Sequence, residues 1–85
     1  MKSIDNNFIE SFQMIMCEIF PSKRESISVV TKECVESTNT WLNGLPAPTS
    51  ELNVRIYFIQ EFFRQMQFQE VLQNEKLLSV LLDDV

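Results

Sequence analysis

The sequence predicts an all-α protein, a small bundle of three to four helices in a single domain spanning residues 1–85. Apolar residues recur at spacings of three and four through most of the chain, the period of a helix with one buried face. Glycine and proline, which interrupt helices, are confined to position 21 and the stretch 44–48. These breaks and the candidate capping residues divide the chain into helices expected at about 5–20, 23–43, 50–66 and 69–82.

The first segment, 5–20, is expected to be an amphipathic helix. Ser3 or Asp5 precedes it, and either side chain can accept a hydrogen bond from an amide of the first turn. Its stripe at helical spacing consists of Ile4, Phe8, Phe12, Ile15 and Ile19. Further apolar side chains beside this stripe make it wider than a helix at the edge of a monomer needs.

The second segment, 23–43, begins with a capping-box pattern, in which Ser22 accepts from a backbone amide and Glu25 reaches back. Its stripe consists of Ile27, Val30, Cys34, Thr38 and Trp41. The stretch 26–31 is rich in β-branched residues, so a strand is the alternative there. We expect a helix, because the capping box and Gly44 bracket one continuous helical period.

The third segment, 50–66, follows Thr49 or Ser50 as its N-cap. Two apolar stripes run along it, one made of Leu52, Ile56, Ile59, Phe63 and Met66 and the other of Val54, Phe58 and Phe62. A fourth helix is expected over 69–82. Neither glycine nor proline separates it from the third, so a bend at 65–68 and one continuous long helix are both open.

The apolar side chains of the third segment surround its axis. Such a helix is central and covered on all sides, and the short neighbours available in this chain would struggle to cover it. A second copy would complete the cover, and symmetric dimers are the commonest oligomers. We therefore expect a homodimer, whose core and dimer interface contain Phe12, Ile19, Phe58, Ile59, Phe62 and Phe63.

The residue types in the chain argue against several classes of function. Because there is no histidine, most zinc sites and every His-based general base are ruled out. No clustered polar motif indicates catalysis, so we expect no enzyme activity, no cofactor and no metal site. Seven Lys and Arg against twelve Asp and Glu give a formal charge of −5. Nucleic-acid binding needs clustered cations, so nucleic acid is not an expected partner.

Three side chains are candidates for contact with a partner protein. Trp41 lies one turn before Gly44, and tryptophan is enriched at binding hot spots, although a core position is the alternative. Asp83 and Asp84, at the C-terminal end, oppose the helix dipole and can meet a cation on a partner. The alternatives for this pair are a solvated tail and a metal-binding pair.

Cysteine usage and the distribution of apolar residues indicate the compartment. Cys17 and Cys34 are expected to be reduced thiols, with a single disulfide as the alternative. The N-terminal residues show no signal-peptide pattern, and no run approaches the ~20 apolar residues of a membrane span. We expect a cytoplasmic protein that makes no membrane contact.

The order of these features resembles a known family. A Glu-Ser-hydrophobic stretch at 25–30 opens a helix that ends at Asn43 and Gly44, a polar capped turn follows, and an Ile/Phe-rich helix precedes a Leu/Val-rich one that closes with Asp83 and Asp84. This pattern, over about 12–84, resembles the YmgB/AriR family of small enterobacterial regulators, the biofilm and acid-resistance connector proteins. The turn at 45–48 and the aromatic density of the third segment depart from that pattern.

The resemblance implies a homodimeric helical protein that modulates a two-component phosphorelay by contact with a response regulator or a sensor kinase, in biofilm or stress control. We therefore expect a non-enzymatic regulator that acts by protein–protein interaction. One alternative is a secretion chaperone or a phage-type inhibitor protein, which would also be small, acidic and helical. Another is a small DNA-binding or DNA-mimicking regulator, although the binding version needs a basic recognition helix.

Overall fold

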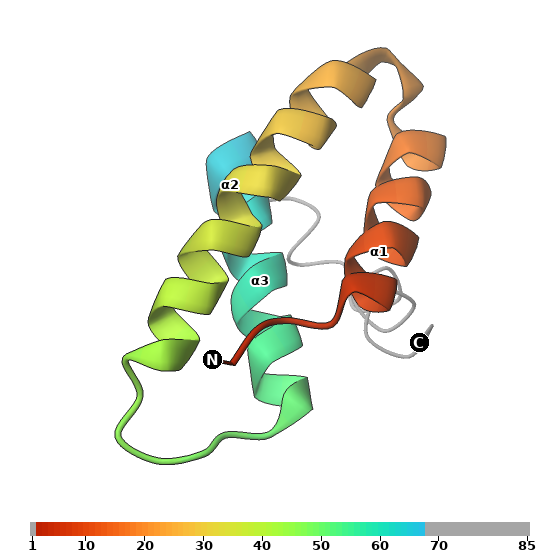
Figure 1. Cartoon of the computed structure of the whole chain (residues 1–85). Helices are drawn as coiled ribbons and strands as arrows, with labels where there is room; N and C mark the ends of the chain where they lie inside the picture. The colour runs from red at the N-terminus through yellow and green to blue at the C-terminus, as the bar shows by residue number, and fades with distance from the viewer. Residues whose placement is uncertain (1, 68–85) are drawn as a thin grey trace.

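The computed structural model describes residues 2–67, which form three α-helices and contain no strand. Helix α1 (Asn6–Ile19) and helix α2 (Arg24–Asn43) form an antiparallel hairpin, joined through the 3₁₀ turn η1 (Pro21–Lys23) (Figure 1). Helix α3 (Glu51–Met66) lies behind this hairpin and runs back along α2. The predicted all-α class and the first three predicted helices are confirmed in this range, and the expected helix at 69–82 lies outside the described residues.

Helix α1 begins and ends at signals that are visible in the sequence. The side chain of Asp5 accepts a hydrogen bond from the amide of Asn7 at 3.0 Å, so Asp5 rather than Ser3 is the cap. At the other end the Phe20 amide donates to the Met16 carbonyl at 2.9 Å. The helix ends there because the residue before a proline, here Pro21, is disfavoured in the α conformation.

Helix α2 begins differently from the prediction. No side chain caps it, and the expected hydrogen bond to Ser22 is absent from this helix start. The 3₁₀ turn, in which the Lys23 amide donates to the Phe20 carbonyl at 3.0 Å, runs directly into α2, so Ser22 does not sit at the helix boundary. The stretch 26–31 lies inside this helix, which excludes the strand alternative.

Helix α3 is bounded by two caps. The Ser50 side chain accepts from the Asn53 amide at 3.2 Å, which confirms Ser50 as the N-cap. At the C-terminal end Gln67 adopts a left-handed conformation with a φ of 62°, and its amide donates to the Arg64 carbonyl at 3.2 Å. A left-handed residue just past the last turn is a common way for a helix to end, because it satisfies otherwise unpaired carbonyls. The helix therefore ends at Met66. This end lies within 65–68, the stretch in which the sequence allowed either a bend or one continuous helix.

The core is built around phenylalanine rings from α1 and α3. Phe12 of α1 meets Phe58 and Phe62 of α3 edge to face, with ring centroids 5.1 and 4.8 Å apart. Phe8 adds a further edge-to-face contact with Phe58, at 5.9 Å. Such ring pairs contribute about 0.5–1.5 kcal/mol each beyond the burial of their area. From α2 the core receives Ile27, Thr31, Cys34, Thr38 and Leu42.

Several predicted positions face away from this core or only border it. Ile19 is 42 % exposed, because it is the last residue of α1 and the buried face runs through Phe8, Phe12 and Met16. Leu52, in the first turn of α3, is also exposed. On α2 the predicted Ile27, Cys34 and Thr38 are buried. The other two predicted positions, Val30 and Trp41, are only partly buried, and their neighbours Thr31 and Leu42 are buried instead.

The argument that α3 needs a second copy to cover it is wrong. Val54 is 7 % exposed, and Phe58, Ile59, Phe62 and Phe63 are fully buried, all within one copy of the chain. These positions follow an i, i+4, i+5, i+8, i+9 pattern, so they form one broad face rather than a complete ring around the helix axis. The single copy therefore covers the residues on which the prediction of a homodimer was based.

Candidate interaction surfaces

The predicted site residues divide into a buried group and a surface residue. Phe12, Phe58, Ile59, Phe62 and Phe63 are inaccessible core residues, so none of them offers a surface to a partner. Ile19 is accessible at the end of α1. Asp83 and Asp84 lie outside the described residues.

Trp41 lies at the surface between α2 and α3, where it stacks on a residue that the sequence did not single out. Its indole is parallel to the ring of Tyr57, with centroids 4.2 Å apart and planes inclined by 3°. Both side chains are partly buried. Trp41 packs against the core, which was the alternative to its prediction as a partner-contact residue. Part of its side chain is nevertheless accessible to solvent. No sequence signal links the two rings, because they come from different helices.

Charged groups border this aromatic pair. The guanidinium Nη2 of Arg64 donates to Glu61 Oε2 at 2.6 Å, one turn along α3 from Tyr57. Partial burial, and next the Glu61 carboxylate, raise the pKa of Tyr57, while Arg64 opposes that rise. The phenol is therefore neutral at physiological pH and available as a hydrogen-bond donor or acceptor. An accessible aromatic pair beside an ion pair has the composition of a protein contact surface.

The two cysteines are free thiols in different surroundings, as the sequence predicts. Cys34 is fully buried below the α2–α3 surface, and burial, followed by the carboxylates of Glu61 and Glu33, raises its thiol pKa to about 12. A thiol held in its neutral form is a poor nucleophile. Cys17 is partly exposed on α1.

The N-terminal segment is bound to the end of α2 by two asparagine side chains, which sequence reasoning missed. Asn39 Oδ1 accepts from the Ile4 amide at 2.8 Å, and Asn43 Oδ1 accepts from the Lys2 amide at 3.1 Å. Asn43 Nδ2 also donates to the Lys2 carbonyl at 2.8 Å. The two asparagines are one helical turn apart and so present their amides in a row to the extended chain.

A cleft of about 310 Å³ lies beside this segment, between the end of α2 and the start of α3. Its most buried charged side chain is Arg55, which donates to Glu51 at 2.7 Å and lies over the Phe8 ring at 5.1 Å. Lys2 and Asp5 also line the cleft. Because the cationic side chains of the cleft are matched by carboxylates, neither sign dominates its electrostatic potential.

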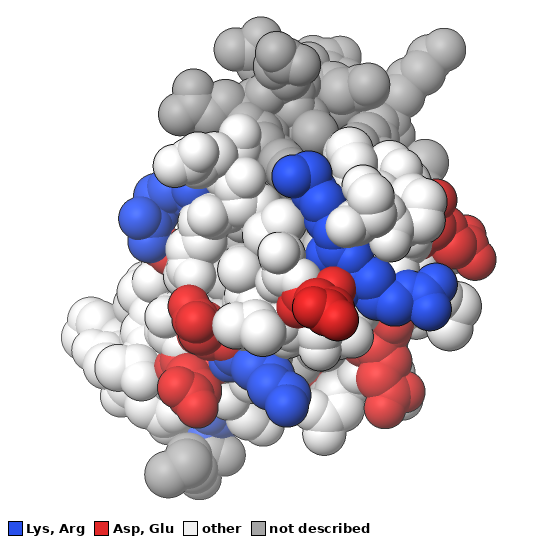
Figure 2. Space-filling model, turned by 90° about the horizontal axis from the view of Figure 1, so that it is seen from above, with Lys and Arg blue, Asp and Glu red and all other residues white. Residues whose placement is uncertain are grey.

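The charges on the described surface are mixed in the same way. Seen from above, Lys and Arg side chains lie next to Asp and Glu side chains, without a broad basic area on that face (Figure 2). Within residues 2–67, no cluster of three or more potential ligating side chains could hold a metal ion. No helix in that range is both long enough and apolar enough to cross a membrane.

Comparison with known proteins adds no relative: no family model, no curated protein and no solved structure matches the chain. Residues 2–67 define a three-helix bundle with a buried aromatic core and an accessible Trp–Tyr pair.

Proposed function

We propose that the protein is a non-enzymatic regulator that acts by binding another protein through the α2–α3 surface around Trp41 and Tyr57. The observation that carries this proposal is the parallel stack of the two rings at the surface. Tryptophan and tyrosine dominate binding hot spots, because they supply a large rigid contact area with a polar tip. The aromatic contacts inside the core are made by phenylalanines. Core packing therefore gives no reason for the rings of Trp41 and Tyr57 to keep solvent-accessible area.

The partner class follows from the resemblance to small connector regulators: a response regulator or a sensor kinase in a two-component phosphorelay. The net negative charge of this chain, −5, favours a partner that carries net positive charge. We also propose that the protein works as a homodimer in the cytoplasm. The interface would have to use exposed residues, because the phenylalanines of α3 are already covered.

The proposal is tested by affinity capture from the native host with the wild type and with Trp41→Ala, followed by quantitative mass spectrometry. We expect one two-component protein to be enriched by the wild type and lost with Trp41→Ala. Direct titration of that purified protein should then show a loss of affinity of roughly tenfold or more, the size of a hot-spot truncation. Tyr57→Phe keeps the stacked ring but removes the hydroxyl, so it should lose less affinity than Trp41→Ala does.

Two controls separate binding from folding. Val29→Ala removes an exposed apolar side chain from another part of α2 and should leave capture unchanged. Circular dichroism should show the same helix content in Trp41→Ala and the wild type. Capture of a secreted effector would instead indicate a chaperone, and equal binding by Trp41→Ala and the wild type would refute the proposed surface.

A further inference from the structure

The last residue of α2, Asn43, is followed by the only glycine of the chain, Gly44. An asparagine in this position is chemically reactive, because the backbone nitrogen of the next residue can attack its side-chain Cγ. Glycine carries no Cβ, so it obstructs this attack less than any other residue does. No other asparagine of the sequence precedes a glycine, so Asn43 is the residue most prone to deamidation.

The reaction has two steps, and water is its only co-reactant. The Gly44 nitrogen loses its proton and bonds to Asn43 Cγ, the Cγ–Nδ2 bond breaks, and the proton and the side-chain amide leave together as ammonia. Water then opens the succinimide ring at either of its carbonyl carbons, which gives aspartate or isoaspartate. A neutral amide is thereby replaced by a carboxylate that is ionised at neutral pH.

In the folded chain both reacting groups are engaged in hydrogen bonds. The Gly44 amide donates to two carbonyls in the last turn of α2, at 3.2 and 3.1 Å. Asn43 Nδ2, the group that must leave, donates to the carbonyls of Lys2 and Asn39, each at 2.8 Å. The attack requires loss of the Gly44 proton and rotation of the Asn43 side chain, and each of these changes breaks hydrogen bonds.

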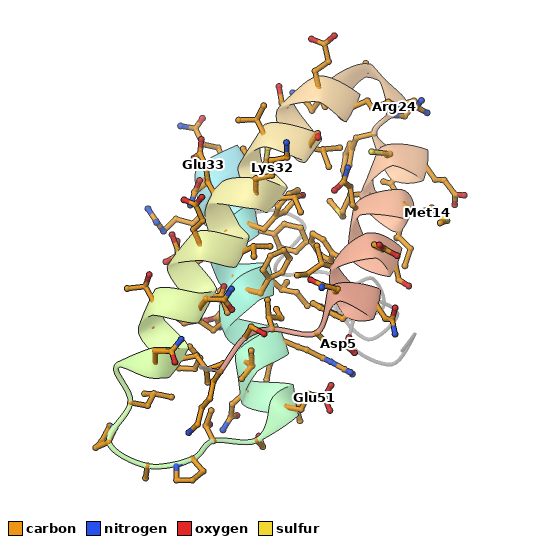
Figure 3. The ribbon with its side chains drawn as sticks, in the orientation of Figure 1. Asp5, Met14, Arg24, Lys32, Glu33 and Glu51 are labelled. Carbon is orange, nitrogen blue, oxygen red and sulfur yellow. The ribbon has the colours of Figure 1, made fainter. Side chains whose placement is uncertain are left out.

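The N-terminal segment, residues 2–5, provides part of this protection. It crosses from the end of α2 to Asp5 at the start of α1 (Figures 1 and 3). The Lys2 amide donates to Asn43 Oδ1 at 3.1 Å and the Lys2 carbonyl accepts from Asn43 Nδ2, so the segment holds both polar atoms of this side chain. Ile4, which is only 4 % exposed, anchors the segment. The side chain of Asn43 therefore cannot turn toward the next residue without losing its contacts with the segment.

We propose that Asn43 is a deamidation site, that the N-terminal segment protects it, and that its conversion to aspartate or isoaspartate releases the segment. Either product lacks Nδ2, so the Lys2 carbonyl loses its donor. The new carboxylate also places a negative charge at the C-terminal end of α2, where the helix dipole disfavours it. Release uncovers Ile4 and widens the cleft that the segment lines, so the reaction exposes apolar surface irreversibly.

Peptide mapping of the aged protein tests the site. Folded wild type and Gly44→Ala are incubated at mildly alkaline pH, which favours loss of the amide proton, and mass spectrometry follows each asparagine. Among the asparagines of residues 2–67, Asn43 should convert first in the wild type and stay intact in Gly44→Ala. Alanine fits this position, because φ is −88° and the added Cβ would lie 3.5 Å from the Thr40 carbonyl oxygen, an ordinary contact. Faster conversion of another of these asparagines, or equal conversion of Asn43 in both proteins, would overturn the site.

A second comparison tests the protection. Asn39→Ala removes the acceptor of the Ile4 amide and loosens the segment, so Asn43 should convert roughly fivefold faster, the effect of one lost hydrogen bond. Val35→Ala trims a partly buried side chain of the same helix and controls for general destabilisation. It should leave the rate close to that of the wild type. Equal acceleration in both variants would show that folding as a whole protects Asn43, and would refute the role of the segment.

The variant Asn43→Asp reproduces one product and tests the release. Hydrogen exchange at the amides of Lys2 and Ile4 should be roughly fivefold faster than in the wild type, because the segment loses the bond to its carbonyl. Asn39→Asp adds the same charge one turn earlier but keeps the acceptor of the Ile4 amide, so exchange should stay close to that of the wild type. Unchanged exchange in Asn43→Asp would overturn the release.

Discussion

Phe12 of α1 and Phe62 of α3 meet edge to face, with their ring centroids 4.8 Å apart and their planes at 86°. Both side chains are almost fully buried, and they come from helices separated in sequence by the whole of α2. This contact joins the first and third helices, so the phenylalanines of α3 are used within the chain. Protein contacts must therefore be made by other residues.

Truncating the central ring should destabilise the fold strongly. Phe12 contacts four phenylalanine rings, and Phe12→Ala should lower the free energy of unfolding by about 3–5 kcal/mol, the usual cost of a large cavity in a core. Urea unfolding followed by circular dichroism measures this loss. Met14→Ala, at an exposed position on the same helix, should change the stability by less than about 0.5 kcal/mol. A loss below 1 kcal/mol for Phe12→Ala, well under the usual core value, would contradict the central place of this ring.

The contact between Asn39 and the N-terminal segment can be tested with a matched pair of variants. Asn39→Ala removes the oxygen that accepts from the Ile4 amide, and should cost about 1 kcal/mol and speed hydrogen exchange at that amide. Asn39→Asp keeps an acceptor at the same place, so exchange should stay close to that of the wild type. Equal exchange in the wild type and Asn39→Ala would show that this hydrogen bond does not hold the segment.

The two thiols should differ in reactivity. At mildly alkaline pH a thiol reagent should modify Cys17 readily, whereas Cys34 should react only after unfolding, because it is buried and its pKa is raised to about 12. Mass spectrometry of the modified chain counts the labelled thiols. Rapid double labelling of the folded protein would contradict the burial of Cys34.

The raised pKa of Cys34 also predicts how stability depends on pH. The unfolded thiol ionises near 9.0, and the folded thiol only near 12, so folding favours the neutral form. The resulting stabilisation is complete below pH 9.0 and is lost as the pH rises toward about 12. Cys34→Ala should lose stability less steeply over this interval, as measured by urea unfolding. Tyr57, whose pKa is also raised, contributes in both proteins, but slightly less in Cys34→Ala because Cys34 is one of the groups that raise the Tyr57 pKa. Parallel pH profiles would refute this role of Cys34.

The helix boundaries could be predicted because they depend on local chemistry. Asp5 and Ser50 cap the helices that follow them, Pro21 stops α1, and Gly44 follows the end of α2. The one local error, at Ser22, arose because a 3₁₀ turn took the place of a capped start. Turn type depends on how α1 and α2 pack, which a short motif does not specify.

The buried faces were harder to predict. On α3 two stripes had the right spacing, and the structure buries Val54, Phe58 and Phe62 while leaving Leu52 exposed. A period near 3.6 identifies an apolar face only to within one or two positions, and the choice depends on which helices cover it. The same uncertainty about which face is buried explains why the sequence suggested that one copy could not cover the apolar side chains of α3.

Contacts between residues that are distant along the chain could not be predicted from the sequence. The stack of Trp41 on Tyr57 and the hydrogen bond of Asn39 to the Ile4 amide each join segments that only the fold brings together. Trp41 could be singled out by its residue type alone. Its partner ring could not, because tyrosine is intermediate in its usual burial and its residue type alone does not separate a core-edge position from a contact site.

The most direct test of a core completed within one copy is the dependence of folding on protein concentration. Circular dichroism and urea unfolding should be measured from micromolar to nanomolar protein, beside sedimentation at the same concentrations. Dilution is expected to separate the proposed dimer into monomers that keep their helix content. Their urea midpoint should fall only by the contribution of dimerisation and then stay constant on further dilution. Loss of helix as the dimer dissociates would show that two copies share the core, and would contradict this account of the fold.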